Sequence, residues 1–208
     1  MANSVLLLSV VVAFCGLWST GVYAEEKTAL VALANGTDSI EAVVTIDILR
    51  RAGINVTVGG KGCHKMFMNH GIIIEVDVTL SEDIGDFDAI VIPGGVEGAR
   101  TFAACEKTGK YLQKAEKDGK LIAAICAGPL VLKAHGIGKG KKITSGPKVE
   151  EEIKEGSVYE YSEDRVVVAD KLITSRAPGT AFEFALAIVK ELLGEDKKNE
   201  IEKPLLLK

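Results

Sequence analysis

A cysteine at a predicted strand-to-helix corner is the residue best suited to chemistry. Residues 121–125 form a wholly apolar run of strand length, followed directly by Cys126 and then by Ala127, Gly128 and Pro129. Small residues here permit a sharp turn, as in a nucleophile elbow with Cys in place of Ser. The start of a helix also stabilises a thiolate and lowers a cysteine pKa below about 8.5. From this segment alone, a small buried apolar Cys126 is an equally good interpretation.

Two other predicted strand ends carry residues that could join this thiol. Glu41 lies in the first turn of a helix predicted over residues 38–52, where Asp38 and Glu41 match a capping box. A buried Glu41 near the thiol would instead act as a proton donor. Gly94 and Gly95 follow an apolar strand and form either a plain turn or a backbone N–H site for an oxyanion. Ligands of such sheets bind outside the carboxyl ends of the strands, where all three segments would meet.

The histidines limit the reaction classes. His64, His70 and His135 are the three in the chain, and none lies beyond position 135. A nucleophile that needs a base far downstream is therefore disfavoured. His64 stands beside Cys63 without further ligands at metal spacing, so we predict no metal site. We expect no cofactor either.

Short apolar strands and amphipathic helices alternate along the chain, which predicts an α/β fold with a mostly parallel central sheet covered by helices on both faces. Helices are predicted over residues 38–52, 108–117, 129–134, 180–193 and 195–203. Strands are predicted over residues 28–34, 54–58, 72–78, 89–92, 121–125, 142–144, 166–169 and 172–174. No repeat or linker interrupts this pattern, so we expect one domain over residues 25–208.

The first 24 residues differ from the rest because they contain no charged side chain and end in a small-x-small pattern. We interpret residues 1–24 as a secretory signal peptide cleaved after Ala24, with an uncleaved anchor or a mitochondrial presequence as alternatives. The apolar run is too short to span a bilayer. Cleavage would remove Cys15 and leave three cysteines, an odd number that excludes a complete disulfide framework. A net charge of −4 does not indicate nucleic acid binding.

Four blocks occur together in this order: DILRRAGI at 47–54, IPGG at 92–95, LIAAICAGP at 121–129 and ITSRAPGTAFEFALAI at 173–188. They resemble the ThiJ/PfpI superfamily, specifically its parkinsonism-associated protein deglycase branch. The resemblance implies a flavodoxin-like three-layer sandwich that forms a homodimer. It also implies that Cys126 is the nucleophilic, oxidation-sensitive cysteine and that Glu41 is a protonated carboxyl bonded to its thiolate. Gly95 and Ala127 match the positions whose backbone N–H groups face the oxyanion.

At three positions this sequence differs from the residues that the superfamily or its protease branch usually carries. The family's partner histidine is replaced by Gly146, within Thr144-Ser145-Gly146-Pro147. His70 stands where the family usually carries an arginine, which it could replace in part. The protease branch has a histidine directly after the cysteine, whereas Ala127 follows it here, so proteolysis is not expected.

The resemblance implies cofactor-independent glyoxalase and protein deglycase chemistry on methylglyoxal-type aldehydes and their early adducts, with a protective role in oxidative stress. The alternative is a redox-sensing or chaperone-like homodimer in which Cys126 is oxidised to a sulfinate without turnover. Residues 1–24 predict a secretory or extracellular location, whereas the family is generally cytoplasmic or mitochondrial. The pairing of Cys63 and Cys105 and the use of the glycosylation sequons at Asn35 and Asn55 stay open.

Overall fold

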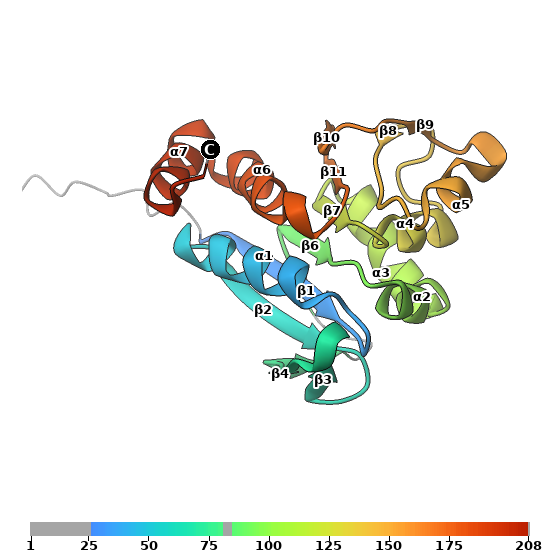
Figure 1. Ribbon diagram of the computed structural model, residues 1–208, viewed down its shortest axis with the longest axis horizontal. Coiled ribbons are helices and arrows are strands. Elements are labelled where there is room, and N and C mark those ends of the chain that lie inside the picture. The colour runs from blue at the N-terminus through green and yellow to red at the C-terminus, as the bar shows by residue number, and fades with distance from the viewer. Residues whose placement is uncertain (1–25, 81–84, 208) are drawn as a thin grey trace, which may run out of the picture.

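A seven-stranded sheet forms the centre of the computed structural model, which describes residues 26–80 and 85–207 (Figure 1). The strand order is β10-β11-β7-β6-β1-β2-β5, and all neighbours are parallel except β10 and β11. The strands are β1 (Thr28–Leu33), β2 (Asn55–Gly60), β5 (Val78–Thr79), β6 (Ala89–Ile92), β7 (Leu121–Ile125), β10 (Val166–Ala169) and β11 (Leu172–Ser175). The predicted α/β class with a mostly parallel central sheet is confirmed.

Helices cover both faces of the sheet and complete a three-layer sandwich (Figure 1). One layer holds α1 (Ser39–Arg51) and α6 (Ala181–Leu193), with α7 (Glu195–Glu202) beside α6. The other layer holds α2 (Val96–Ala103), α3 (Glu106–Lys117), α4 (Pro129–His135) and α5 (Glu150–Lys154). None of the helices within the described ranges is long and apolar enough to cross a membrane.

The pleat of the central strands divides the core into two clusters. Along β1, Val31 and Leu33 pack in the cluster under α1 and α6, whereas Leu30 and Ala32 pack in the cluster on the opposite face. Successive side chains of a strand point to opposite faces, so a strand buried on both sides must be apolar throughout. This explains why the central strand β7 is an unbroken apolar run with all five residues buried.

The stretch predicted as one strand over residues 72–78 is divided between two sheets. Its first part, β4 (Ile73–Glu75), forms a hairpin with β3 (Lys65–Phe67), and β5 adds to the edge of the main sheet. The chain changes sheet at Val76 and Asp77, whose N–H groups bond to His64 and to Val58. Alternating apolar residues do not reveal such a switch of hydrogen-bond partner, so the single-strand prediction is wrong.

The other differences concern short elements. Helices α2 and α5 were not predicted, and a small parallel pair joins β8 (Lys142–Ile143) to β9 (Glu160–Tyr161). In the part of the chain that the structure describes, four 3₁₀ turns also occur, at Asn69–Gly71, Glu155–Ser157, Pro178–Thr180 and Lys203–Leu205. The predicted signal peptide, residues 1–24, lies outside the described residues.

Candidate active site

The corner between β7 and α4 has the predicted sharp geometry. Cys126 adopts a backbone φ of 59°, in the left-handed region that residues other than glycine rarely occupy. Its N–H donates to the Ser175 carbonyl at 2.9 Å, and its carbonyl accepts from the Gly146 N–H at 2.7 Å. Gly128 closes the turn by donating to the Ile125 carbonyl at 2.8 Å. Neighbouring backbone therefore holds Cys126 in a strained conformation, as in nucleophile elbows.

Glu41 is fully buried and faces this corner from the first turn of α1. Its Oε2 accepts a hydrogen bond from the Gly94 N–H at 2.7 Å. Its carboxyl also shares a hydrogen bond with the Cys126 thiol. Oε1 has no hydrogen-bond partner within the described part of the chain. The structure thus brings together the thiol and the carboxyl that the sequence analysis singled out from separate segments.

The predicted capping box is only half formed. Asp38 caps α1 by accepting from the N–H groups of Ile40 and Glu41, at 3.0 and 3.1 Å. The Glu41 side chain does not return to Asp38, whose N–H donates to the Gly94 carbonyl at 3.0 Å instead. A side chain reaching inward to Gly94 cannot also serve the cap. The prediction of a reciprocal capping box is therefore wrong, and the Glu41 side chain belongs to the Cys126 site.

The glycine pair after β6 lets the two segments approach each other. A methyl group on Gly94 would lie 2.6 Å from both the Cys126 Cβ and the Glu41 Oε2. Gly95 has a φ of 88°, and a methyl group there would lie 2.2 Å from the Gly36 carbonyl oxygen. Only glycine fits either position. Their backbone serves the site directly, because Gly94 donates to Glu41 and Gly95, like Ala127, donates to Cys126.

Gly146 lies directly against the sulfur, as its replacement of the family histidine suggested. A methyl group on Gly146 would lie 2.9 Å from the Cys126 Sγ and 3.0 Å from the Arg176 carbonyl oxygen. His70, predicted to replace the family's arginine in part, is exposed on the turn between β3 and β4. His135 is also engaged elsewhere, with its Nε2 3.0 Å from the Phe102 carbonyl.

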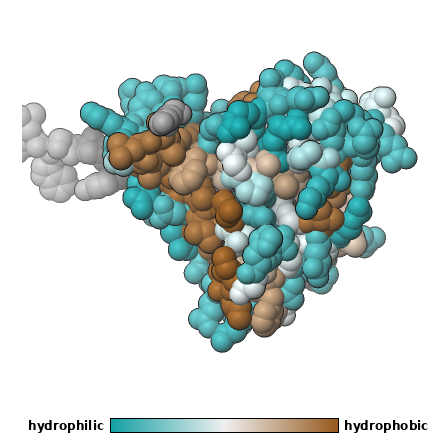
Figure 2. Space-filling view, in the orientation of Figure 1, coloured by the Kyte–Doolittle hydropathy of each residue, from teal (hydrophilic) through white to brown (hydrophobic). Residues whose placement is uncertain are grey.

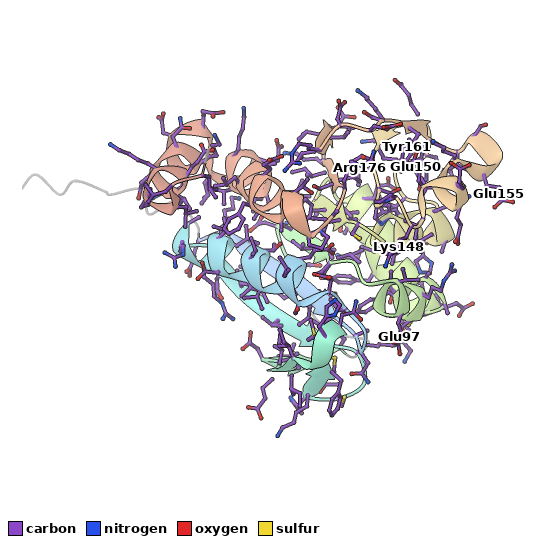
Figure 3. The ribbon with its side chains drawn as sticks, viewed as in Figure 1. Glu97, Lys148, Glu150, Glu155, Tyr161 and Arg176 are labelled. Carbon is purple, nitrogen blue, oxygen red and sulfur yellow. The ribbon has the colours of Figure 1, made fainter. Side chains whose placement is uncertain are left out.

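Arg176 is a nearby charged residue that the sequence analysis did not single out. Its Nη2 donates to Glu150 at 3.2 Å, while Nη1 is buried without a partner in the described residues. Figure 3 shows Arg176 beside Glu150 and near Tyr161, on the side of the molecule formed by α5 and β9. Its position directly after β11, in a parallel sheet, was the signal that could have identified it.

Burial is the largest influence on the pKa values of Glu41 and Cys126. It raises the pKa of Glu41 to about 7, assisted by the charge of Asp38 and opposed by hydrogen bonds from Gly94 and Cys126. Burial also raises the pKa of Cys126 to about 12, together with the charge and hydrogen bond of Glu41, against the N–H groups of Gly95 and Ala127. The sequence prediction of a lowered cysteine pKa is wrong because it counted the helix start and neglected burial and the adjacent carboxylate.

Near neutral pH the two groups therefore carry at most one negative charge between them. A second charge is opposed because the buried Glu41 carboxylate repels a thiolate beside it. When Glu41 keeps its proton, this repulsion is absent and the carboxyl can donate to the sulfur. The N–H groups of Gly95 and Ala127 then favour the charge on Sγ. The arrangement can present a thiolate stabilised by a neutral acid.

Neither a disulfide nor a cluster of metal-binding side chains adds to this site in the described residues. Cys63, Cys105 and Cys126 are all free thiols in the described chain, so Cys63 and Cys105 do not pair. In residues 26–80 and 85–207, no group of three or more His, Cys, Asp or Glu side chains is placed to hold a metal ion.

The fold and site define a class of α/β sandwich proteins with a cysteine at a strand-to-helix elbow and a buried carboxyl against its sulfur. Comparison with known families then identifies the chain, which belongs to the DJ-1/PfpI family, whose sequence profile matches residues 27–191.

Curated relatives are similar over nearly their whole lengths. The chain is 44% identical to "Protein dj-1beta" of Drosophila melanogaster over 184 residues, covering 87% of this chain and 97% of that protein. It is 43% identical to "Glutathione-independent glyoxalase DJR-1.2" of Caenorhabditis elegans over 187 residues, covering 88% and 98%. It is 42% identical to "Parkinson disease protein 7 homolog" of Danio rerio over 185 residues, covering 88% and 98%.

Solved structures agree with the fold. The crystal structure of Drosophila melanogaster DJ-1beta has a TM-score of 0.84 at 41% identity, covering 88% of this chain and 99% of that one. A structure described as oxidized Toxoplasma gondii DJ-1 has a TM-score of 0.79 at 34% identity, covering 86% and 98%.

Proposed function

We propose that this protein is a cofactor-independent glyoxalase and protein deglycase that acts on methylglyoxal-type aldehydes and their early adducts, with a protective role in oxidative stress. The observation that carries the proposal is the buried Glu41 carboxyl hydrogen-bonded to Cys126. A thiolate supplies the nucleophile for an aldehyde carbon, and a carboxyl with a pKa of about 7 can both donate and accept protons at neutral pH. The relative in Caenorhabditis elegans whose name states a glutathione-independent glyoxalase supports this reaction class.

The reaction begins when the Cys126 Sγ forms a bond to the aldehyde carbon of methylglyoxal. The carbonyl oxygen takes the negative charge beside the N–H groups of Gly95 and Ala127 and then a proton from Glu41, which gives a hemithioacetal. Glu41 then transfers a proton from the former aldehyde carbon to the adjacent carbon, while the hydroxyl proton moves to the neighbouring ketone oxygen, and the adduct becomes a thioester. Water cleaves the carbon–sulfur bond, releasing lactate and the thiol. Glyoxal gives glycolate by the same steps.

We expect Cys126→Ser to lower methylglyoxal consumption at least about a hundredfold, because a hydroxyl at this site supplies no comparable nucleophile. Methylglyoxal loss and lactate formation should be measured together without glutathione. Cys63→Ser is the matched control, since Cys63 is an exposed thiol outside the site. Turnover that persists in Cys126→Ser would remove this cysteine from the mechanism.

A redox-sensing role of the same site is the second candidate. Gly146 faces the sulfur where the family has a histidine, and sensing needs no such base. Oxidation of Cys126 to a sulfinate would place an oxygen within reach of the Glu41 carboxyl. The Toxoplasma gondii relative, described as oxidized, supports this candidate. After mild peroxide, peptide mass spectrometry should find two added oxygens at Cys126 before any at the exposed Cys63; a Cys126 that stays reduced while Cys63 is oxidised would reject the role.

We also propose that the protein forms a homodimer through an exposed apolar surface, which we call the α1–hairpin face. It comprises Ile40 and Val43 of α1 with Phe67, Ile72 and Ile73 of the β3–β4 region, which are 47–58% exposed. Figure 2 shows apolar surface over α1 and this hairpin. Apolar patches of this kind favour association, and a second copy is the partner that the family resemblance implies.

For the N-terminal segment we propose entry into the secretory route, followed by cleavage after Ala24. The charge-free first 24 residues and the small-x-small pattern at their end support this proposal. N-terminal sequencing of protein purified from its native source tests it. A mature chain that begins at Glu25 supports secretion, whereas a retained Met1 or Ala2 contradicts it.

A further inference from the structure

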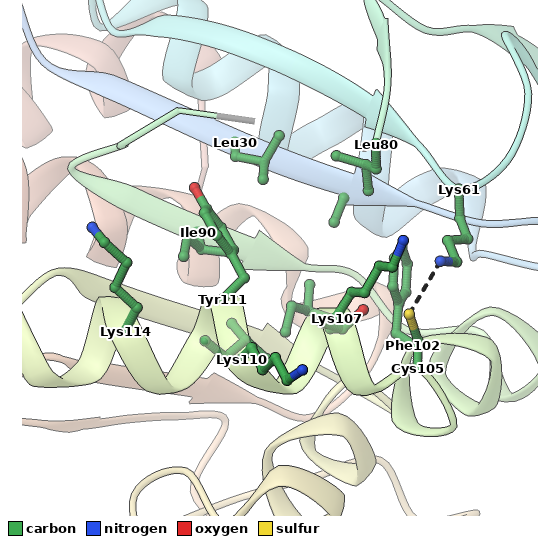
Figure 4. Close-up of a pocket in the computed structure, with 14 residues that line it drawn as sticks. Leu30, Lys61, Leu80, Ile90, Phe102, Cys105, Lys107, Lys110, Tyr111 and Lys114 are labelled. Atoms are coloured by element: carbon green, nitrogen blue, oxygen red, sulfur yellow. Dashed lines mark hydrogen bonds between the residues drawn. The ribbon is translucent and has the colours of Figure 1, made fainter. Parts of the chain in front are cut away.

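A second thiol lies in a pocket that the proposed reaction does not use. The pocket has a volume of about 430 Å³ and lies between α3 and the sheet face opposite α1 (Figure 4). Its apolar wall includes Leu30, Leu80 and Ile90, and Cys105 lies at its edge. This volume is within the range of about 300–1,000 Å³ that is typical of small-molecule sites. Among the described lining residues, none belongs to the Cys126 site.

The charged residues that line this pocket are all cationic. They are Lys61, Lys107, Lys110 and Lys114, and the described lining contains no carboxylate. Lys114 is paired with Asp86 and Asp118. In Figure 4 the amino groups of Lys61 and Lys107 point to the end of the pocket where Cys105 lies. The pocket therefore joins an apolar wall to a cationic end, a combination that suits an anion with a hydrocarbon tail.

Cys105 is also chemically activated. The Lys61 Nζ lies 3.1 Å from its Sγ, within range of a charge-assisted hydrogen bond. Burial raises the pKa of this thiol, but hydrogen bonds from the Thr108 side chain and N–H, together with Lys61, outweigh it and lower the pKa to about 7. The lowered pKa favours the thiolate at neutral pH, and the thiolate is the reactive form of cysteine.

We propose that this pocket, which we call the Cys105 pocket, is a second reactive site that captures amphipathic anionic enones, such as 4-oxo-2-alkenoic acids. The carboxylate would lie against Lys61 and Lys107, and the alkyl tail would lie along Leu30 and Leu80. This places the electrophilic carbon, which is bonded to the carboxylate, beside the Cys105 Sγ. The geometry rests on the lining residues and the Lys61 contact and does not depend on the Cys126 reaction.

The capture step needs no oxidant or cofactor. The thiolate of Cys105 forms a bond to the carbon β to the ketone, while the carbon–carbon π bond breaks and its electron pair moves onto the ketone oxygen. The electron pair of this enolate then returns to the carbon α to the ketone, which takes a proton from the Lys61 ammonium and gives the saturated ketone. Water restores the proton to Lys61. The product is a thioether adduct of Cys105, and no group leaves.

Matched probes test this proposal on the wild-type protein. The probes are trans-4-oxo-2-nonenoic acid and its methyl ester, which share the enone and the tail but differ in charge. Peptide mass spectrometry measures adducts at Cys105 relative to Cys63, an exposed thiol that serves as an internal reference. We expect the Cys105-to-Cys63 ratio to be at least about fivefold higher for the acid than for the ester, because the lysines attract only the anion. Equal ratios would overturn the proposal.

Lysine variants identify which residues make Cys105 react with the acid probe in preference to the ester. Lys107→Gln should reduce the acid-to-ester preference at Cys105 without lowering labelling by the ester. Lys61→Gln should lower labelling by both probes, because it also removes the cation that activates the thiol. Lys65→Gln is the matched control, since Lys65 is an exposed hairpin lysine paired with Glu75. An effect of Lys65→Gln as large as that of Lys107→Gln would overturn the proposal.

Discussion

At the scale of single residues, the site depends on a carboxyl held where its charge is costly. Glu41 is fully buried, and the charge of Asp38, which has the same sign, raises its pKa further. The Gly94 N–H offsets only part of that cost. Such groups recur at catalytic sites because a proton that is easily gained and lost at neutral pH is useful there.

The Glu41 pKa makes stability depend on pH. Its folded pKa of about 7 lies above the ordinary value of 4.5, so the folded state binds the proton more tightly. The contribution of Glu41 to stability is therefore fully present below pH 4.5 and is lost as pH rises through 7. Relative to Glu41→Gln, the wild-type free energy of unfolding should fall by on the order of 3 kcal/mol between pH 4.5 and 8. Urea denaturation of both proteins measures this difference; parallel pH profiles would contradict it.

Gly146 sets how closely the backbone approaches the nucleophile. Gly146→Ala should slow alkylation of Cys126 by about tenfold and cost about 1–3 kcal/mol of stability, because the new methyl would crowd Sγ at 2.9 Å. Iodoacetamide labelling and urea denaturation measure the two effects. Gly179→Ala is the control, since a methyl there meets nothing within 4 Å. Equal labelling rates in both variants would contradict this prediction, because the loop that carries Gly146 would then have moved away from Sγ.

At the scale of elements, three strand ends and one helix cap assemble the site. β1 leads into α1 and delivers Glu41, β6 leads into the Gly94–Gly95 turn, and β7 leads into the elbow at Cys126. Parallel pairing of β1, β6 and β7 brings their carboxyl ends to one edge of the sheet. The register of the sheet therefore decides which side chains meet.

The Asp38 cap orients the first turn of α1, which carries Glu41. Asp38→Ala should destabilise the protein by about 1 kcal/mol, because two N–H groups lose their acceptor. Asp38→Asn keeps an acceptor oxygen and should stay within a few tenths of a kcal/mol of wild type. It should also lower the pKa of Glu41, since the Asp38 charge helps to raise it. Urea denaturation checks the stability order, and an Asn variant as unstable as the Ala variant would contradict the capping role.

At the scale of the whole molecule, the two helical layers leave part of the surface apolar. The central strands are covered on both faces, yet the α1–hairpin face exposes large aliphatic and aromatic side chains. A folded chain gains little from such exposure, whereas a self-complementary contact would bury it.

Association through this face predicts a specific effect of charge. Val43→Glu should shift the protein from dimer to monomer in analytical ultracentrifugation, because a carboxylate would be buried twice across a two-fold contact. Val168→Glu is the matched control, because Val168 is 54% exposed on the edge strand β10, away from this face. A wild-type protein that sediments as a monomer, or a Val43→Glu dimer, would contradict the proposed interface.

Local patterns determined much of this protein. The apolar run before Cys126 predicts a strand buried on both faces, and the small residues after it predict a tight corner; both are present. The α/β class followed from the alternation of elements, because burial on two faces requires apolar strands. The family resemblance singled out Glu41 and Gly146 from positions that spacing alone left ambiguous.

Only the tertiary structure decided the state of the thiol and the division of residues 72–78. The pKa of Cys126 depends on burial and on a carboxyl 85 positions earlier in the chain, and no local pattern encodes either. The Cys105 pocket likewise joins Lys61 to α3 across the fold. Electrostatics and hydrogen-bond partners are long-range properties, whereas periodicity reports only which face of an element is apolar.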